Sequence, residues 1–359
     1  MKTKMKLGFG HMDMSNSVYI EYEKGNHEIV PYDSEKPRTG SHYCIVDSLG
    51  GDRIPIDPDF DYSKIDVDLI YWWLQGGATK NSVALKSIKK LRKQWDGILL
   101  INWEEAYWFT KPYVKQRLES CIESAELATA VVNGYLNFDR RMDDIQFKSK
   151  KVKWRYLVTP YDTEWIKNKY AKTPKSETRI IYSMIHGRTT KCERTLTTMY
   201  DLHKEMPNLE YVINRYRFVP REDFNEITLK STDIPLEDLK FIKVIDPLDP
   251  WEVYANYIGS SWMFIDEYPS YSQSHATLDS ACFGTPVLSH QYNSAAVICF
   301  PKIIVEFNNV NQWFKMAKKL LVDQEFYNSV RDYGTVAVSH YSIESFYKQL
   351  CDIYDEFKK

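Results

Sequence analysis

One acidic residue, Asp279, lies just ahead of an abrupt change from a helical to an extended pattern in the segment SHATLDSACFGTPVLSH, residues 274–290. Gly284-Thr285-Pro286 ends the predicted helix, because proline lacks the backbone N–H that a helix interior needs, and a short apolar strand follows. A carboxylate held here could accept two hydrogen bonds from a vicinal diol such as that of a ribose. An acid on a helix could equally be exposed to solvent, so the interpretation depends on the surrounding segments.

A second segment with the residue types for chemistry is YSMIHGRTTKCER, residues 182–194. A predicted strand ends there, Gly187 allows a turn, and three cations, Arg188, Lys191 and Arg194, gather before a predicted helix. Cations beside the free N–H groups of a helix N-terminus form a cradle for a diphosphate. The alternative is ordinary surface charge, which we disfavour because positive charge at a helix N-terminus costs free energy unless an anion binds.

A pair of carboxylates follows the apolar run ILLI in the segment NWEEAYW, residues 102–108. Glu104 therefore lies at the carboxyl end of a predicted strand, where it could orient a hydroxyl acceptor and take up its proton. The alternative is that Glu104 and Glu105 begin a solvated helix, whose N-terminus favours negative charge. The sequence alone leaves both interpretations open.

Two other motifs predict little chemistry. Gly8 and Gly10 follow a strand but lack the third glycine and the downstream acid of a dinucleotide-binding loop, so we interpret them as a flexible turn. Asp66 and Asp68 resemble a metal-binding acid pair. They precede the apolar run LIYWW, however, at the edge of a parallel sheet where ligands do not bind.

Composition limits the class of protein. The chain has 359 residues, of which 43% are hydrophobic and 27% charged, with a formal net charge of −2. This charge neither requires nor excludes a polyanionic partner. The six cysteines form no C-x-x-C pair, and no apolar run approaches the roughly 20 residues of a membrane span. We expect a soluble, cytoplasmic protein of about two domains without a membrane partner.

Strands and helices alternate along both halves of the chain. In the first half we predict strands at Lys6–Phe9, Glu28–Tyr32, Cys44–Val46, Leu69–Trp73, Gly97–Asn102 and Leu127–Asn133, and helices at Ser82–Gln94 and Tyr113–Ala125. In the second half we predict strands at Arg179–Ile185, Leu209–Asn214, Leu239–Ile245, Ser261–Asp266 and Pro286–Ser289, helices at Glu193–Met206, Pro250–Ile258 and Thr277–Cys282, and a helical end of roughly 50 residues. This alternation predicts α/β architecture with parallel sheets covered on both faces.

The predicted domains are residues 1–160 and 177–335, joined by a charged, proline-containing linker at 161–176, with a C-terminal helix at 336–359. Two doubly wound domains imply a cleft between them. Ligands of such sheets bind beyond the carboxyl ends of the strands, at helix N-termini.

The run YANYIGSSWMFIDEYPS followed by TLDSACFGTPVLS resembles the nucleotide-sugar signature of retaining GT-B glycosyltransferases, and the likeness covers most of residues 175–335. The resemblance implies a GT-B fold of two Rossmann-like domains facing each other across a cleft, with a final helix that crosses back to the first domain. It assigns the ribose-binding acid to Asp279 and the diphosphate clamp to Gly187 and Arg188. The family's cation falls on Arg194 if one residue has been inserted, with Lys191 a nearer substitute.

Within that family the chain looks most similar to the bacteriophage DNA α-glucosyltransferases that act on 5-hydroxymethylcytosine. The segments that carry this likeness are GRTTKCERTLTTMYDLHKEM, TLDSACFGTP and FYNSVRDYGTVAVSHYSIESFYKQLCDIYDEF. Many family members hold the sugar with a second glutamate eight residues before the ribose acid. Tyr271 stands there, so we expect sugar recognition through Ser274, His275 or backbone N–H groups. UDP-glucose and a UDP-pentose both remain candidate donors.

The resemblance implies transfer of a sugar from a UDP-sugar to a hydroxyl with retention. Arg188 and Arg194 would neutralise the departing diphosphate, Glu104 would position the acceptor, and no metal would be required. For duplex DNA, the basic stretches 86–93 and 148–155 could follow the phosphates, while a flipped base stacks on aromatic residues near Trp103. The alternatives are solvated basic surfaces, a polysaccharide or lipid acceptor, and a non-catalytic nucleotide-sugar or DNA-binding protein. The oligomeric state is not predicted.

Overall fold

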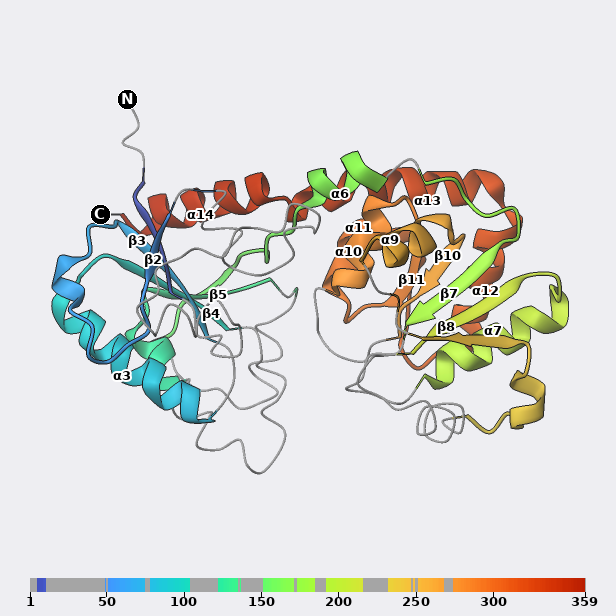
Figure 1. Cartoon of the computed structure of the whole chain (residues 1–359), viewed down its shortest axis with the longest axis horizontal. Helices are drawn as coiled ribbons and strands as arrows, with labels where there is room; N and C mark the ends of the chain where they lie inside the picture. The colour runs from blue at the N-terminus through green and yellow to red at the C-terminus, as the bar shows by residue number, and fades with distance from the viewer. Residues whose placement is uncertain are drawn as a thin grey trace. The chain divides into compact units, whose positions relative to one another are not determined.

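The computed structural model describes residues 5–10, 49, 51–74, 78–103, 122–134, 136, 151–170, 173–184, 192–215, 232–246, 248, 251–267 and 274–358. The chain divides into two compact units (Figure 1). Unit 1 comprises Met1–Tyr161 together with Ile343–Lys359, and unit 2 comprises Asp162–Ser342. Each unit is built on its own six-stranded sheet.

The sheet of unit 1 is parallel throughout, with the strand order β2-β1-β3-β4-β5-β6. Its strands are β1 (Leu7–Gly10), β2 (Asp52–Ile54), β3 (Leu69–Leu74), β4 (Ile98–Trp103), β5 (Ala130–Asn133) and β6 (Trp154–Tyr156). The central strands β3 and β4 are continuous apolar runs, as expected for strands that are covered on both faces. The strands predicted at Glu28–Tyr32 and Cys44–Val46 lie outside the described residues.

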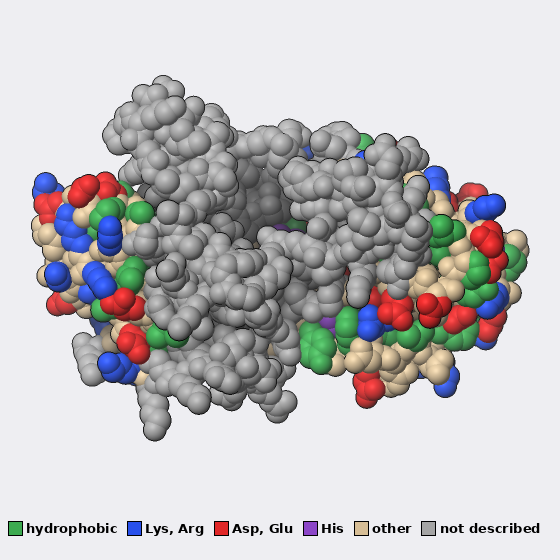
Figure 2. All heavy atoms as spheres, turned by 90° about the horizontal axis from the view of Figure 1, so that it is seen from below, with side chains coloured by type: hydrophobic (Ala, Val, Ile, Leu, Met, Phe, Trp, Pro, Cys, Tyr) green, Lys and Arg blue, Asp and Glu red, His purple; other side chains and the backbone are tan. Residues whose placement is uncertain are grey.

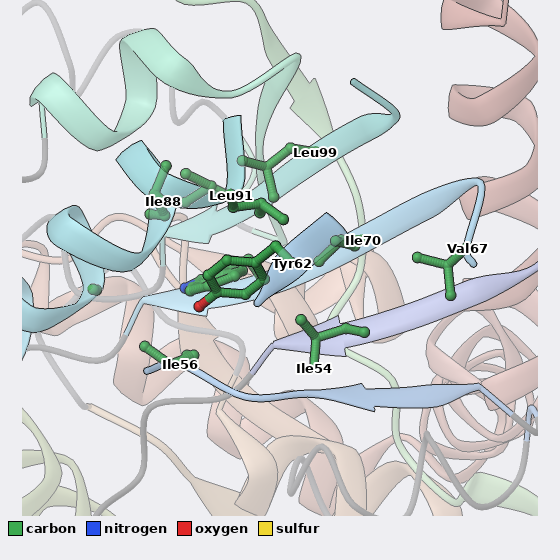
Figure 3. Close-up of a cluster of buried hydrophobic side chains, with 11 residues drawn as sticks. Ile54, Ile56, Tyr62, Val67, Ile70, Ile88, Leu91 and Leu99 are labelled. Carbon is green, nitrogen blue, oxygen red and sulfur yellow. The ribbon is translucent and has the colours of Figure 1, made fainter. Parts of the chain in front are cut away.

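Helix α3 (Ala78–Gln94) covers one face of this sheet. Ile88 and Leu91 of α3 pack with Ile70 and Leu99 of the sheet and with Tyr62, in the buried cluster drawn in Figure 3. Tyr62 belongs to a short 3-10 helix, η1 (Tyr62–Lys64), and its hydroxyl donates a 2.9 Å hydrogen bond to the carbonyl of Pro55. The helix predicted at Ser82–Gln94 is confirmed, and α3 begins four residues earlier.

Helix α14 (Ile343–Phe357) covers the other face of the same sheet. Tyr71 and Ile70 are successive residues of β3 and so point to opposite faces. Tyr71 meets the ring of Phe346 edge-on at 5.5 Å, whereas Ile70 faces α3. The side chain of Gln349 accepts a 3.3 Å hydrogen bond from the N–H of Val158, and further along the helix Arg155 pairs with Glu356. Helix α14 therefore belongs structurally to unit 1.

The sheet of unit 2 is also parallel, with the order β12-β11-β10-β7-β8-β9. Its strands are β7 (Ile180–Met184), β8 (Glu210–Asn214), β9 (Ile242–Ile245), β10 (Met263–Ile265), β11 (Val287–His290) and β12 (Ile304–Val305). The chain leaves β7 in one direction for β8 and β9 and then crosses to β10. The strand order therefore reverses between β7 and β10, and ligands of doubly wound sheets bind beside such a reversal.

The helices of unit 2 are α6 (Thr163–Tyr170), α7 (Glu193–Glu205), α9 (Trp251–Ser260), α10 (His275–Cys282), α11 (Ser294–Cys299), α12 (Val310–Val322) and α13 (Gln324–Ala337). Helix α7 packs beside α12, and α10 packs against α6 and α9. The residues predicted as a linker include α6, whose Ile166 and Tyr170 are buried. The stretch looked irregular because of its charge and prolines, although its apolar residues pack as part of unit 2. Leu239 ends a 3-10 helix, η6 (Leu236–Leu239), so the strand predicted at Leu239–Ile245 begins three residues later than expected.

Candidate functional site

Asp279 is buried in the middle of α10, with only 4% of its surface exposed. One carboxylate oxygen, Oδ2, accepts a 2.9 Å hydrogen bond from the hydroxyl of Tyr254 on α9. Burial, and next the charge of Asp279, hold the pKa of Tyr254 well above its usual value, so the phenol keeps its proton and remains a donor. The interpretation of Asp279 as a solvent-exposed acid is therefore wrong.

Other tyrosines extend the environment of Asp279 toward the sheet. Tyr182 of β7 lies with its ring 5.6 Å from that of Tyr257, and its hydroxyl accepts a 2.8 Å hydrogen bond from the side-chain amide of Asn214. Burial raises the pKa of Tyr182, the hydrogen bond from Asn214 opposes this rise, and the charge of Asp279 adds to it. The carboxylate of Asp279 thus lies among neutral phenols. Their hydroxyl groups can stabilise an anion by hydrogen bonding, although they carry no positive charge.

The exit from α10 has the geometry that the glycine and proline predict. The helix ends at Cys282, and Gly284 adopts a left-handed conformation with φ of +66°. The N–H of Thr285 then donates a 2.7 Å hydrogen bond to the carbonyl of Ser280, which satisfies an acceptor at the helix end before β11 begins.

The start of α10 is set by Ser274, its N-cap residue. Ser274 has φ of +35°, and among the described residues it is the only non-glycine with a positive φ. Its hydroxyl accepts a 3.4 Å hydrogen bond from the N–H of Thr277 and donates a 2.6 Å hydrogen bond to Asp266. Such a conformation costs free energy for a residue with a Cβ, so the hydroxyl contacts must hold it. His275, the first residue of α10, is exposed.

Asp266, which directly follows β10, connects the starts of two helices. Its Oδ2 accepts hydrogen bonds from the hydroxyl of Thr277 at 3.1 Å and from the amide of Asn293 at 3.0 Å, in addition to that from Ser274. Asn293 is in turn the N-cap residue of α11, where its Oδ1 accepts from the N–H of Ala296 at 3.0 Å. The carboxylate is 1% exposed, and these hydrogen bonds stabilise its burial.

The next residue, Glu267, binds the N-terminus of a third helix. Its carboxylate accepts hydrogen bonds from the backbone N–H groups of Arg194 at 3.1 Å and Thr195 at 2.7 Å, in the first turn of α7. It also pairs with the guanidinium of Arg194 at 3.1 Å. Burial raises the pKa of Glu267, and these hydrogen bonds oppose that rise. Negative charge at this position is favourable because the helix N-terminus carries partial positive charge.

Arg194 itself has an acceptor at each of its three guanidinium nitrogens. Besides Glu267, Nε donates to the carbonyl of Phe307 at 2.6 Å and a terminal nitrogen donates to Oδ1 of Asn308 at 2.9 Å. The guanidinium also lies 3.9 Å from the centre of the Phe307 ring. Arg194, predicted to bind a diphosphate, therefore already donates to three protein groups.

The structure brings Arg194, Ser274, His275 and Asp279 to helices of unit 2 whose starts meet the carboxyl end of β10. Gly187, Arg188 and Lys191 belong to the connection between β7 and α7, which lies outside the described residues. Glu104 and Tyr271, elsewhere in the chain, also lie outside the described residues. Sequence reasoning missed Asp266 and Glu267. The available signal was two adjacent acids at the carboxyl end of a predicted strand.

In the described part of the chain, no group of three or more His, Cys, Asp or Glu side chains could hold a metal ion. Within the same residues, no helix has both the length and the apolar character of a bilayer span.

No family model and no curated protein matches this chain. Solved structures do match. HepE of Anabaena in complex with UDP-glucose is 8% identical, with a TM-score of 0.63, and the match covers 98% of this chain and 100% of HepE. Sucrose-phosphate synthase of Thermosynechococcus elongatus is 14% identical over 82% of this chain and 75% of its own, with a TM-score of 0.56. An E. coli trehalose-6-phosphate protein bound with UDP-2-fluoro glucose is 11% identical over 80% and 72%, with a TM-score of 0.57.

At such low identity the likeness is one of fold. The predicted class, α/β of the GT-B type with two Rossmann-like doubly wound domains, is confirmed.

Proposed function

We propose that this chain is a glycosyltransferase that moves a sugar from a UDP-sugar to a hydroxyl with retention. The observation that carries the proposal is a buried carboxylate, Asp279, on a helix whose start meets the carboxyl end of β10, in a fold that aligns with 98% coverage to a protein solved with UDP-glucose. Ligands of doubly wound sheets bind at this edge. Function still depends on the site rather than on the fold, so the residues must be tested individually.

The donor half of the proposed site lies in unit 2. Asp279 would accept hydrogen bonds from the ribose hydroxyls, with Tyr254 fixing the orientation of its carboxylate through the bond to Oδ2. Ser274 and His275, at the start of α10, would contact the sugar or the phosphates. Gly187, Arg188 and Lys191 would bind the diphosphate, and positive charge there would stabilise the leaving group.

In the acceptor half of the proposed site, Glu104, the residue after β4, would position the acceptor hydroxyl.

We propose 5-hydroxymethylcytosine in DNA as the acceptor, on the basis of the sequence resemblance and the charge of α3. That helix has no acidic residue over its 17 positions. Lys86 and Lys93 are exposed and Lys90 is partly exposed, and the spacing of four and three residues aligns them on one face.

Among the described residues these three lysines have no acidic partner, whereas their neighbour Lys89 pairs with Glu123. In the view of Figure 2, basic and acidic side chains alternate over the described surface, so charge of one sign does not dominate that face. A row of lysines on one face of α3, without an acidic partner in the part of the chain that the structure describes, would suit contact with successive phosphates.

The test is incubation of the protein with a panel of UDP-sugars and DNA containing either cytosine or 5-hydroxymethylcytosine. Digestion to nucleosides and mass spectrometry should reveal a hexose or pentose increment on the modified base only. NMR of the product would give the anomeric configuration and so test retention. UDP-sugar hydrolysis without a DNA adduct would move the acceptor to a polysaccharide or lipid. A UDP-sugar that stabilises the protein yet never turns over would instead indicate a non-catalytic nucleotide-sugar binder.

A further inference from the structure

Two consecutive acids, Asp266 and Glu267, follow β10 at the reversal of the strand order in unit 2. Successive residues of an extended chain point to opposite sides, and these two carboxylates bind different helices. Asp266 receives hydrogen bonds at the starts of α10 and α11, while Glu267 receives them at the start of α7. Three helix N-termini are therefore tied to two adjacent residues.

We propose that Asp266 and Glu267 are positioning residues that fix these helix starts, and the side chain of Arg194, for binding of the donor diphosphate. This inference rests on the proposed function of the site. Neither acid would contact the substrate, because both carboxylates are buried and already accept hydrogen bonds from protein groups. Their effect on the reaction would pass through the helices, whose partial positive charge attracts phosphate only if the N-termini are held in place.

Arg194 takes the same role in this proposal, rather than that of a diphosphate clamp. A guanidinium offers five N–H donors in a rigid fork, and here the fork joins Glu267, Phe307 and Asn308. Turning the fork so that both terminal nitrogens bind a phosphate would break its contacts with Glu267 and with the residues after β12. Glu267 would then be left as a buried carboxylate without its cation, which is strongly unfavourable.

The experiment compares Arg194→Lys, Glu267→Gln and the double variant with the wild-type protein. The matched control is Glu205→Gln, which removes the exposed pair between Lys318 and the other end of α7. Calorimetry would measure the dissociation constants of UDP and UMP, and urea titration would measure the free energy of unfolding. UMP lacks the second phosphate, so the ratio of the two constants isolates the contribution of the diphosphate.

We expect each single variant to lower the preference for UDP over UMP by about tenfold, because each breaks a charge-assisted contact that holds the helix start. The double variant should lose little more than either single one, both in this ratio and in unfolding.

Three results would overturn the proposal: additive effects of the two substitutions, an unchanged ratio in Glu267→Gln, or equal losses for UDP and UMP, which indicate a purely structural role. If Glu267→Gln fails to fold, Glu267→Asp keeps the charge with a shorter reach and should reproduce the loss of preference. Absence of UDP binding by the wild-type protein would contradict the proposed function instead, while the unfolding measurements would still test the coupling of Glu267 to Arg194.

Discussion

The hydroxyl of Tyr254 and the carboxylate of Asp279 form a 2.9 Å hydrogen bond between α9 and α10. Asp279 is buried and Tyr254 is half-buried, and the elevated pKa of Tyr254 keeps the proton on the phenol. Oδ2 of Asp279 is thereby fixed against α9. The orientation of the acid that we assign to the ribose thus depends on α9, whose Tyr254 is the first residue of the run YANYIGSSWMFIDEYPS in the resembled signature.

Tyr254→Phe should lower the free energy of unfolding by about 1 to 3 kcal/mol, because it removes the donor from a buried carboxylate. The affinity of this variant for UDP should also fall, because the carboxylate of Asp279 would be free to turn away from the ribose. Asp279→Asn should weaken UDP binding further. Calorimetry on both variants and their combination would measure the coupling, and independent effects of the two substitutions would contradict a shared role.

Ser274 offers a test of backbone strain at the start of α10. Ser274→Ala loses the hydroxyl bonded to Asp266 and keeps a Cβ at φ of +35°, whereas Ser274→Gly loses the same hydroxyl and relieves the strain. We expect the alanine variant to be less stable than the glycine variant by about 1 kcal/mol. Equal midpoints in urea unfolding would mean that the positive φ stores no strain.

Lys175 predicts a dependence of stability on pH. Its ammonium donates to the carbonyls of Gly259 and Ser261 and to the hydroxyl of Thr285, at 3.0, 2.8 and 2.6 Å. Burial, and next the charge of Arg331, lower the pKa of Lys175 from 10.5 to about 7. Between these two pH values the unfolded chain holds a proton that the folded chain has released, so stability should rise with pH by at most about 1.4 kcal/mol per pH unit.

The measurement is urea unfolding of the wild-type protein and Lys175→Met from pH 6 to pH 10. The stability of the wild type should increase relative to the variant above about pH 7. A constant difference would mean that the three acceptors, which need all three protons of the ammonium, keep Lys175 charged in the folded protein.

The lysines of α3 provide a test of the acceptor. Replacing Lys86, Lys90 and Lys93 with glutamine should reduce the slope of log affinity against log salt for duplex DNA by about 2 to 3, given a loss of roughly 0.9 per phosphate contact. The control replaces three exposed lysines elsewhere, Lys240, Lys302 and Lys348, for the same change in net charge. Equal slopes for the two triple variants would indicate that α3 is an ordinary solvated helix.

The architecture followed from local patterns, because alternation of apolar runs and helical periodicity is visible within short windows. The strands around Leu69, Ile181 and Phe264 were predicted in this way and are confirmed. Strand order was not predictable by this means, since periodicity says nothing about which strands are neighbours. Helix α6 was missed because charge and proline obscured the few apolar residues that pack against α10.

The candidate site was predictable only where a motif is contiguous. Asp279 stands next to its glycine and proline, so its segment was recognisable. The contact between Glu267 and Arg194 spans 73 positions, and the pairing of Asp266 with Asn293 spans 27. Both arise from the packing of helices around β10, and no local pattern encodes them.

Helix α14 covers unit 1 but is encoded after the whole of unit 2. A ribosome therefore completes the continuous unit first, while Tyr71 and its neighbours still await the helix that covers their face of the sheet. Domains generally fold as units during synthesis, so unit 2 can acquire its structure before unit 1 is complete. The unit whose residues are translated first is thus the last to be finished, and until α14 has been made, the uncovered apolar face of its sheet is prone to aggregation.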